Sequence, residues 1–381
     1  MKTKRNGFTL IELIAVTAMT LVVATSLFGS MIAQQRSYAY QLAASDAAQN
    51  ARAALSIVKN ELRMAGWGLT GRDDTNVEFP AVGTCRTAIP NQYQCNGVDS
   101  GADSLRIISM VPTRFDDSTR WDGGSPDTHD VNDFPTGGPP TGTDPAGIPV
   151  DTLAFIDGMC NNGAPPDVAD VDLVSITAAT AGLSYRHEYT VAAAPSPTYP
   201  APTCTGASAF VDGFKMGMAR IVDFWVDRTM TVPAPTSANP SAVKVLPRLM
   251  MQVNADSDNI NGSPSAEQVV AYNIDSFQVQ YGIDLGLGEL TPIADKLPDQ
   301  VADTWCDDLN ACDTTASSLS YTTQELAARV VAVRVAVVPL AESSSDSVGS
   351  PLVAFDRTIS ADKNRRWIFR STVRLRNNEL D

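Results

Sequence analysis

The chain has 381 residues, of which 44% are hydrophobic and 19% are charged, and its formal net charge is −15. This length and apolar content allow a sizeable hydrophobic core. The acidic balance excludes a typical nucleic-acid-binding protein, because such proteins carry basic patches that neutralise phosphates. It fits a protein that is kept soluble outside the cytoplasm by its charge.

The N-terminus carries a short basic stretch and then a long apolar run. Lys2, Lys4 and Arg5 precede Gly7, and residues 13–33 contain no charge. The run reaches the roughly 20 residues that a membrane-spanning helix needs. It exceeds the roughly 7–15 apolar residues of a secretory signal peptide. We therefore predict a membrane helix whose positive N-terminus stays in the cytoplasm.

One acid, Glu12, lies at the start of this apolar segment. A carboxylate in a membrane-spanning helix costs roughly 2.5–3.5 kcal/mol or more. An ordinary single-span anchor explains the length of the segment but leaves Glu12 without a role.

The sequence GFTLIEL at residues 7–13 resembles the class III leader of type IV pilins and their relatives. The resemblance implies that residues 1–7 are a leader, removed by a prepilin peptidase that cuts after Gly7. It also implies that the new N-terminal residue, Phe8, is N-methylated. A buried amine needs a partner, and Glu12 can accept from Phe8 of a neighbouring subunit or of its own. In the first case the pair would set the register between subunits during assembly.

The apolar segment at 8–33 is expected to continue as an amphipathic helix over residues 34–66. No proline occurs before Pro80, and Gly66 and Gly68 end the pattern. Apolar residues recur at steps of three and four, which indicates one buried face. From Phe8 to Met64 the helix would be about 85 Å long. The residues of this stripe are Ala44, Ala48, Ala51, Leu55, Val58, Leu62 and Ala65.

Residues 67–381 are expected to form a β-rich head. The predicted strands are 104–111, 153–156, 171–177, 218–226, 243–253, 267–283, 327–339 and 365–377. The last strand alternates an apolar face with a row of arginines, which predicts a half-buried antiparallel strand. We interpret that row as a solvated face paired with carboxylates rather than as a ligand site. Stretches rich in Gly, Pro, Asp and Thr, at 113–150, 193–205, 229–242 and 341–351, are predicted to be surface loop insertions.

The whole pattern predicts an α+β pilin fold. A long N-terminal helix, half membrane-spanning and half amphipathic, packs on an antiparallel sheet head with long loop insertions.

Six cysteines follow the membrane segment, and an even number in an exported chain suggests disulfides. Sequential pairing is the simplest of fifteen connectivities. No C-x-x-C motif occurs, so a zinc site is not expected. The candidate pairs are Cys85 with Cys95, Cys160 with Cys204, and Cys306 with Cys312.

Asn254, Asp256 and Asp258 space oxygen ligands like the start of a calcium loop. The glycine and glutamate that complete such a loop are missing, and a polar turn is the simpler interpretation. The sequence also lacks the common catalytic motifs G-x-S-x-G, H-E-x-x-H and the P-loop. We expect neither an enzyme nor a cofactor.

Several segments are similar to PilW-type minor pilins. They are residues 60–67, which end the helix, residues 102–107, residues 273–282, residues 331–335 and residues 369–377.

This resemblance implies a minor pilin that primes assembly of a type IV pilus and sits in a tip complex. Its partners would be other minor pilins, the major pilin and a PilY-type adhesin. It would lie in the inner membrane with a periplasmic head before assembly, and in the extracellular fibre afterwards. Two alternatives stay open: a large pseudopilin of a type II secretion system, and an adhesive tip subunit that binds a surface.

Overall fold

The computed structural model describes twenty segments of the chain, and the statements below concern these residues. They are residues 9–67, 82–83, 103–112, 120–121, 128–132, 153–161, 168–181, 186–193, 209–210, 215–233, 241, 243–253, 267–285, 301–307, 312, 326, 329–342, 351–355, 357–359 and 364–375.

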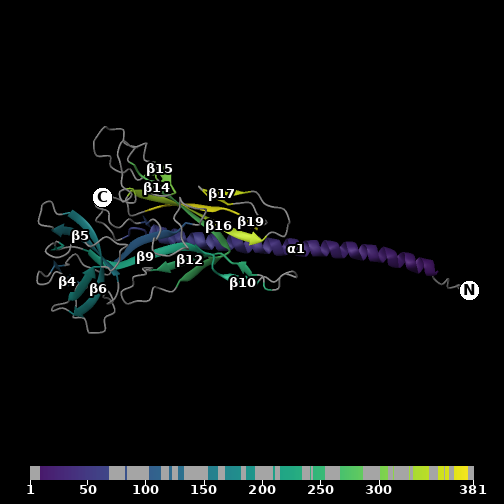
Figure 1. The fold of residues 1–381 in the computed structure, drawn as a ribbon, viewed down its shortest axis with the longest axis horizontal. Helices are drawn as coiled ribbons and strands as arrows, with labels where there is room; N and C mark the ends of the chain where they lie inside the picture. Colours follow the sequence, from purple (N-terminus) through teal and green to yellow (C-terminus); the bar gives the residue numbers. More distant parts are fainter. Residues whose placement is uncertain are drawn as a thin grey trace, which may run out of the picture.

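A single helix, α1, runs from Leu10 to Arg63 and extends far beyond the head (Figure 1). Its 54 residues correspond to about 81 Å at 1.5 Å per residue. The predicted long helix is confirmed, with its last helical residue three positions before the predicted end at residue 66. Helix residues that meet the head are apolar on one face only, which is why the helix docks along one stripe.

The head contains one large antiparallel sheet, in the order β1-β2-β9-β5-β6-β7-β4-β3, with β12, β13 and β8 attached to it. Strand β9 lies at its centre, because β5, β2 and β12 all pair with successive parts of it. The strands are β1 Val82–Gly83, β2 Leu105–Pro112, β3 Arg120–Trp121, β4 Thr128–Asn132, β5 Leu153–Asn161, β6 Val168–Ala181, β7 Arg186–Ala193, β8 Ala209–Phe210, β9 Lys215–Asp227, β12 Arg248–Val253 and β13 Gln268–Tyr272.

A second antiparallel sheet comes from the C-terminal part of the chain, in the order β15-β14-β16-β19, with β20 also on β16. Two separate hairpins pair β10 with β11 and β17 with β18. The strands are β10 Thr231–Pro233, β11 Val243–Val245, β14 Ile274–Ile283, β15 Thr304–Cys306, β16 Val330–Glu342, β17 Leu352–Ala354, β18 Arg357–Ile359, β19 Asn364–Arg366 and β20 Phe369–Arg374.

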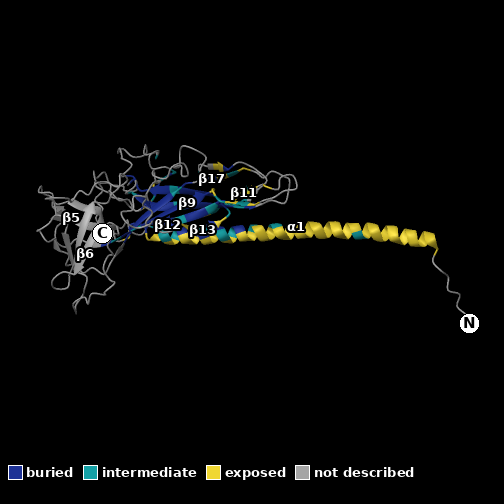
Figure 2. Ribbon diagram, turned by 60° about the horizontal axis from the view of Figure 1, so that its bottom comes forward, coloured by how far each residue is buried: buried dark blue, intermediate teal, exposed yellow. Residues whose placement is uncertain are grey.

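The main core lies where the docked end of α1 meets both sheets (Figure 2). It contains Leu62 of the helix, Phe224 of β9 and Phe277 of β14, all fully buried. Strand β16 is buried on both faces, since Val338 belongs to a second cluster with Ala354 and Ile359 of the β17–β18 hairpin. The α+β fold, a long apolar helix with an antiparallel sheet head, is as predicted.

The largest correction concerns the segment between β2 and β9. These two strands are direct antiparallel neighbours, with Leu105 opposite Phe224, although more than a hundred residues separate them in sequence. Residues 113–150 were predicted to be a loop, but they contain β3 and β4. Both belong to an extension of the large sheet at the end of the head away from the N-terminus (Figure 1). The insertion is thus a piece of sheet, which short strands among turn residues do not reveal.

Three predicted strands are interrupted. Residues 243–253 divide at Leu246 and Pro247, because proline lacks the amide hydrogen that a sheet needs. Residues 267–283 divide at Asn273, whose φ of 60° lies in the left-handed region that asparagine tolerates. This turn passes the chain from β13 of the large sheet to β14 of the second. Residues 365–377 divide between β19 and β20. The predicted loops at 229–242 and 341–351 likewise include β10 and the last residues of β16.

Candidate assembly surface on the N-terminal helix

The first turn of α1 is closed by Thr9 and Glu12, which cap the helix reciprocally. The Glu12 carboxylate accepts hydrogen bonds from the backbone N–H and the hydroxyl of Thr9, both at 3.0 Å. The Glu12 N–H donates to the Thr9 hydroxyl at 3.4 Å. This capping box satisfies amide groups that the first turn leaves without partners. Glu12 therefore has a local structural role within its own chain.

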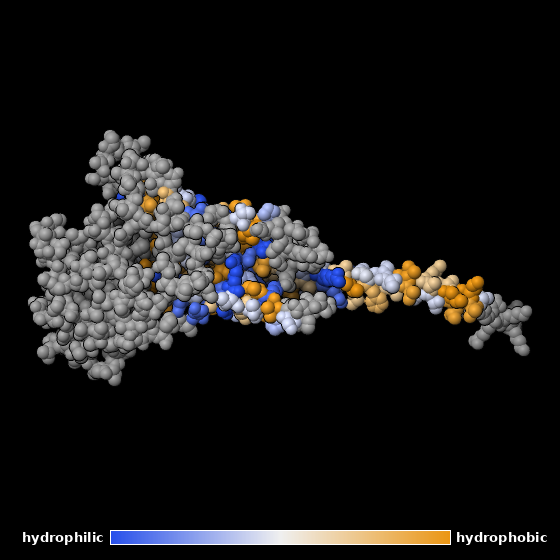
Figure 3. Space-filling model, viewed as in Figure 1, coloured by the Kyte–Doolittle hydropathy of each residue, from blue (hydrophilic) through white to orange (hydrophobic). Residues whose placement is uncertain are grey.

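Residues 10–43, here called the projecting segment, extend away from the core of the head, and most of them are exposed (Figure 2). Large apolar side chains are exposed all around this segment, from Leu10 at 76% to Leu42 at 52%. The space-filling view shows it as a mostly hydrophobic cylinder (Figure 3). So much contiguous apolar surface marks a site of contact with lipid or protein.

Within the uncharged run at residues 13–33, four hydroxyl side chains bond to the helix backbone. The hydroxyls of Thr17, Thr20, Thr25 and Ser30 donate to carbonyl groups three or four residues earlier, at 2.7–3.1 Å. A hydroxyl without a partner would be costly in lipid. This pattern makes residues 13–33 compatible with an apolar surrounding, and α1 is long and apolar enough to cross a membrane.

Residues 44–63, here called the docked segment, carry the predicted stripe into the core. Ala51, Val58 and Leu62 are fully buried, and Ala65 just after the helix is buried with them. Ala44 and Ala48 are only half-buried. Ala47 and Ala54, which the predicted stripe did not include, are also buried. The stripe is confirmed and is wider than one residue per turn.

Polar contacts hold the docked segment at both ends. Near its start, the Asn50 amide donates to the Tyr272 carbonyl at 3.4 Å, and the Arg52 guanidinium lies 5.8 Å from the centre of the Phe369 ring. Near its end, the two carboxylate oxygens of Glu61 accept from the two terminal nitrogens of Arg220 on β9, one of them at 3.0 Å. This bidentate pair raises the pKa of Arg220 above its usual value, against the opposing effect of burial.

Arg220 and Glu61 could not be paired from the sequence, because 159 residues separate them. The structure brings them together because β9 passes beneath the last turns of α1 (Figure 1). The pair ties the helix to the centre of the large sheet.

Charged groups link strands within the large sheet and also join the two sheets. On β2, the Arg106 guanidinium makes two hydrogen bonds, at 2.8 and 2.9 Å, to the buried carboxylate of Asp223 on β9. Just before β2, the Asp103 N–H donates to the Phe277 carbonyl at 2.8 Å, and the Asp103 carboxylate accepts from the Val279 N–H at 2.7 Å. Asp103 thus joins β2 to β14 of the other sheet.

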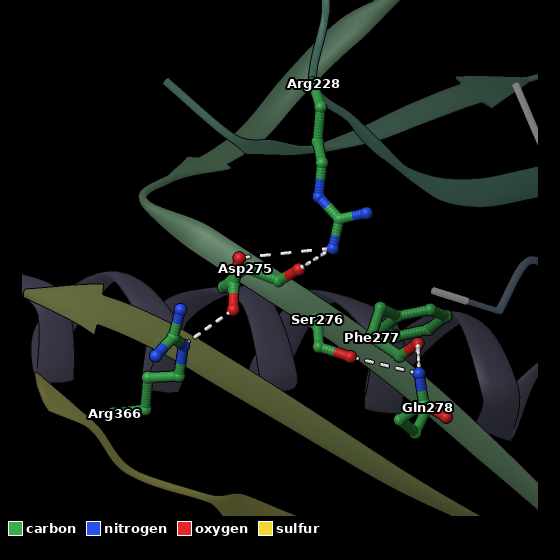
Figure 4. Close-up of polar contacts among 6 residues, drawn as sticks. All are labelled: Arg228, Asp275, Ser276, Phe277, Gln278 and Arg366. Atoms are coloured by element: carbon green, nitrogen blue, oxygen red, sulfur yellow. Dashed lines mark hydrogen bonds and ion pairs between the residues drawn. The ribbon is translucent and has the colours of Figure 1, made fainter. Parts of the chain in front are cut away.

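Asp275 of β14 lies between two arginines from different elements (Figure 4). Its carboxylate accepts from Arg366 of β19 at 2.7 Å and lies 4.0 Å from Arg228, which also donates to the Asp275 carbonyl. The predicted arginine row is therefore not uniform. Arg370 is exposed, as expected for a solvated face, whereas the Arg366 side chain is 12% exposed and paired.

The structure describes only some of the remaining predicted site residues. Gly7 and Phe8 lie outside the described residues, as do Cys85, Cys95, Cys204 and the calcium candidates Asn254, Asp256 and Asp258. Cys160 lies on β5, opposite Phe210 of β8. Cys306 and Cys312 form a disulfide with their Cα atoms 5.2 Å apart.

Comparison with known protein families gives a match to part of the chain. Residues 235–377 match the family model described as Type IV Pilus-assembly protein W. No curated protein and no solved structure matches the chain. The matched residues begin just after β10 and run through β20, so they include the second sheet and its contact with α1. The match supports a protein related to type IV pili.

Proposed function

We propose that the protein is a minor pilin of a type IV pilus, which helps to start assembly and sits at the tip of the fibre. The observation that carries this proposal is the projecting segment. Its exposed apolar side chains need lipid before assembly and neighbouring helices afterwards. The match over residues 235–377 supports the link to pili.

Processing follows from the same proposal. Prepilin peptidase removes residues 1–7 by cutting after Gly7, and Phe8 becomes the methylated N-terminus. Thr9, the next residue, is bonded to the Glu12 carboxylate. This carboxylate can accept from the Phe8 amine of its own chain. It can instead accept from Phe8 of the next subunit, which would fix the register between the two helices.

The size of the head supports placement at the tip. The sheet insertion between β2 and β9 widens the end of the head that lies away from the projecting segment (Figure 1). A bulky head would hinder the stacking of subunits along a fibre, whereas nothing stacks beyond the tip. Other minor pilins, the major pilin and a PilY-type adhesin are the partners that this position provides. The protein starts in the inner membrane and ends in the extracellular fibre.

Mass spectrometry of the mature protein tests the processing directly. We expect a chain that begins at N-methylated Phe8. A chain that starts at Met1, or one that is cut near residue 30, would contradict the proposal. Loss of surface pili and twitching in a deletion strain would support it, and loss of protein secretion alone would indicate a secretion pseudopilin instead. Glycan or surface binding by the purified protein, with pili still formed in the deletion strain, would indicate an adhesive role.

Variants of Glu12 separate its two roles. Glu12→Gln keeps the hydrogen-bonding groups of the capping box but removes the charge that pairs with the amine. Thr9→Ala removes the cap and keeps the charge. We expect Glu12→Gln and Glu12→Ala to reduce incorporation into fibres strongly and Thr9→Ala to reduce it much less, with the head folded in all three. Equal incorporation by Glu12→Gln and the natural protein would remove the pairing role.

A further inference from the structure

A groove of about 330 Å³ lies between the docked segment of α1 and strand β20. Four cationic side chains line it: Arg52, Lys59 and Arg63 from the helix and Arg370 from the strand. No acidic residue is among the described residues of its lining. In a chain of net charge −15, a groove lined in this way is a local reversal of the overall charge.

The groove follows the edge of the second sheet. Phe369, Arg370 and Ser371 all line it, although consecutive strand residues point to opposite faces. A cavity that touches all three must therefore run beside the strand and not over one face. Among the described strands, β20 pairs only with β16, so its other edge carries no described partner.

The helix cations form a line and not a compact cluster. Arg52, Lys59 and Arg63 follow one side of the helix, and the distance from the first to the last is about 16 Å at 1.5 Å per residue. An extended peptide of about five residues has this length. A single phosphate or carboxylate could meet only one end of the line.

The cations are available to a partner. Lys59 and Arg63 have no hydrogen bond or ion pair within the described part of the chain. Arg52 contacts the ring of Phe369, and Arg370 donates to the Val353 carbonyl at 3.0 Å and lies 5.3 Å from the centre of the Phe355 ring. These contacts orient both guanidinium groups without neutralising their charge.

The position of the groove favours a protein over lipid. Arg52 lies nineteen residues beyond Ala33, the end of the predicted membrane segment, which corresponds to about 28 Å along the helix. Lipid headgroups beside the membrane segment would not reach it. Attraction between exposed charges also weakens beyond about 8–10 Å at ordinary salt, so the partner must enter the groove.

We propose that this groove binds an extended acidic segment of a partner protein, whose carboxylates meet Arg52, Lys59, Arg63 and Arg370. The segment would lie between α1 and the free edge of β20. This inference depends on the groove alone and holds whether or not the protein is placed at a fibre tip.

Fluorescence anisotropy tests the proposal with the full chain in a neutral detergent. The probe is a labelled ten-residue peptide that alternates aspartate and valine, and the control probe alternates lysine and valine. We expect saturable binding of the acidic peptide only, weakened by salt. Arg63→Glu should weaken it about tenfold, since reversing one charge near a carboxylate costs about 1–2 kcal/mol. Arg36→Glu is the matched control, because Arg36 is an exposed arginine of the same helix outside the groove.

Three results would overturn the proposal. They are no saturable binding of the acidic peptide up to millimolar concentration, an equal loss of affinity in Arg63→Glu and Arg36→Glu, and binding of phosphatidylglycerol vesicles through the groove in place of the peptide. Equal urea midpoints for the three proteins would show that a changed affinity is not caused by unfolding.

Discussion

The projecting and docked segments are two halves of one continuous helix, yet they differ in how their apolar side chains are used. In the projecting segment these side chains surround the helix and stay exposed, as with Leu21 at 69%. In the docked segment they form one stripe, and Leu62 is fully buried. The first arrangement suits a surrounding that is apolar on every side, and the second suits one sheet-covered face.

Because of this difference, one unbroken helix can lie in an apolar medium along its first half and pack on the head along its second half. The docked segment fixes the direction of α1 through packing and through the Glu61–Arg220 pair. Among the described residues, none of the projecting segment is buried in the core of the head. Changes in the docked segment should therefore affect folding of the head, and changes in the projecting segment should affect assembly.

Truncation of a leucine in each half gives the largest expected contrast. Leu62→Ala should lower the free energy of unfolding of the head by about 2–5 kcal/mol, because it leaves a cavity in the core. Leu21→Ala, the matched change in the projecting segment, should alter it by less than about 0.5 kcal/mol. Urea unfolding of the full chain in detergent, followed by tryptophan fluorescence, measures both. Similar losses would show that the two halves are not independent.

The Glu61–Arg220 pair should have a smaller effect. Glu61→Gln should destabilise the head by about 1–2 kcal/mol, the range for a charged hydrogen bond that is partly open to solvent. The Arg220 side chain is 29% exposed, which keeps the expected value at the lower end. A double-mutant cycle with Arg220→Gln isolates the coupling. Additive effects of the two single changes would show that the pair does not hold the helix to β9.

Acidification should lower the stability of the head through Asp227, a carboxylate at the end of β9 that makes no hydrogen bond with the described residues of α1. Burial alone would raise the pKa of Asp227, but hydrogen bonds from Thr229 and Arg248 outweigh it and lower the pKa below its ordinary value of 3.8. The stabilisation is thus complete above this value and is lost as the pH falls through the lower pKa of the folded state.

Asp227→Asn should therefore destabilise the head at neutral pH by about 1 kcal/mol and reduce the loss of stability between pH 5 and pH 2. Urea midpoints at both pH values measure this. Parallel pH curves for the variant and the natural protein would contradict it. The helical content of the projecting segment, followed by circular dichroism in detergent, should change little over the same range.

Strand prediction from the sequence succeeded for some parts of the head and failed for others, most of all in the insertion between β2 and β9. Strands β9 and β16 were predicted close to their bounds, because each is a long apolar run that the core buries. The end of β14 was also predicted, but not its start, because the turn at Asn273 was not foreseen. Strands β3, β4 and β8 were missed, because short strands among turn residues take their conformation from pairing with neighbours and not from local preference. Strand β7 was missed as well, although it is eight residues long. Sheet pairing over long separations carries no local signal.

The sequence by itself determined the helix, its two halves and the buried stripe, since these depend on the spacing of apolar residues within a few turns. The resemblance of residues 7–13 to pilin leaders also predicted a cleaved leader and a role for Glu12 in assembly. Tertiary structure alone decided that Glu61 meets Arg220, that Asp103 joins the two sheets, and that three helix cations lie beside Arg370 of β20. Each of these contacts joins residues more than a hundred positions apart, so only the folded chain brings them within reach of a hydrogen bond or a shared groove.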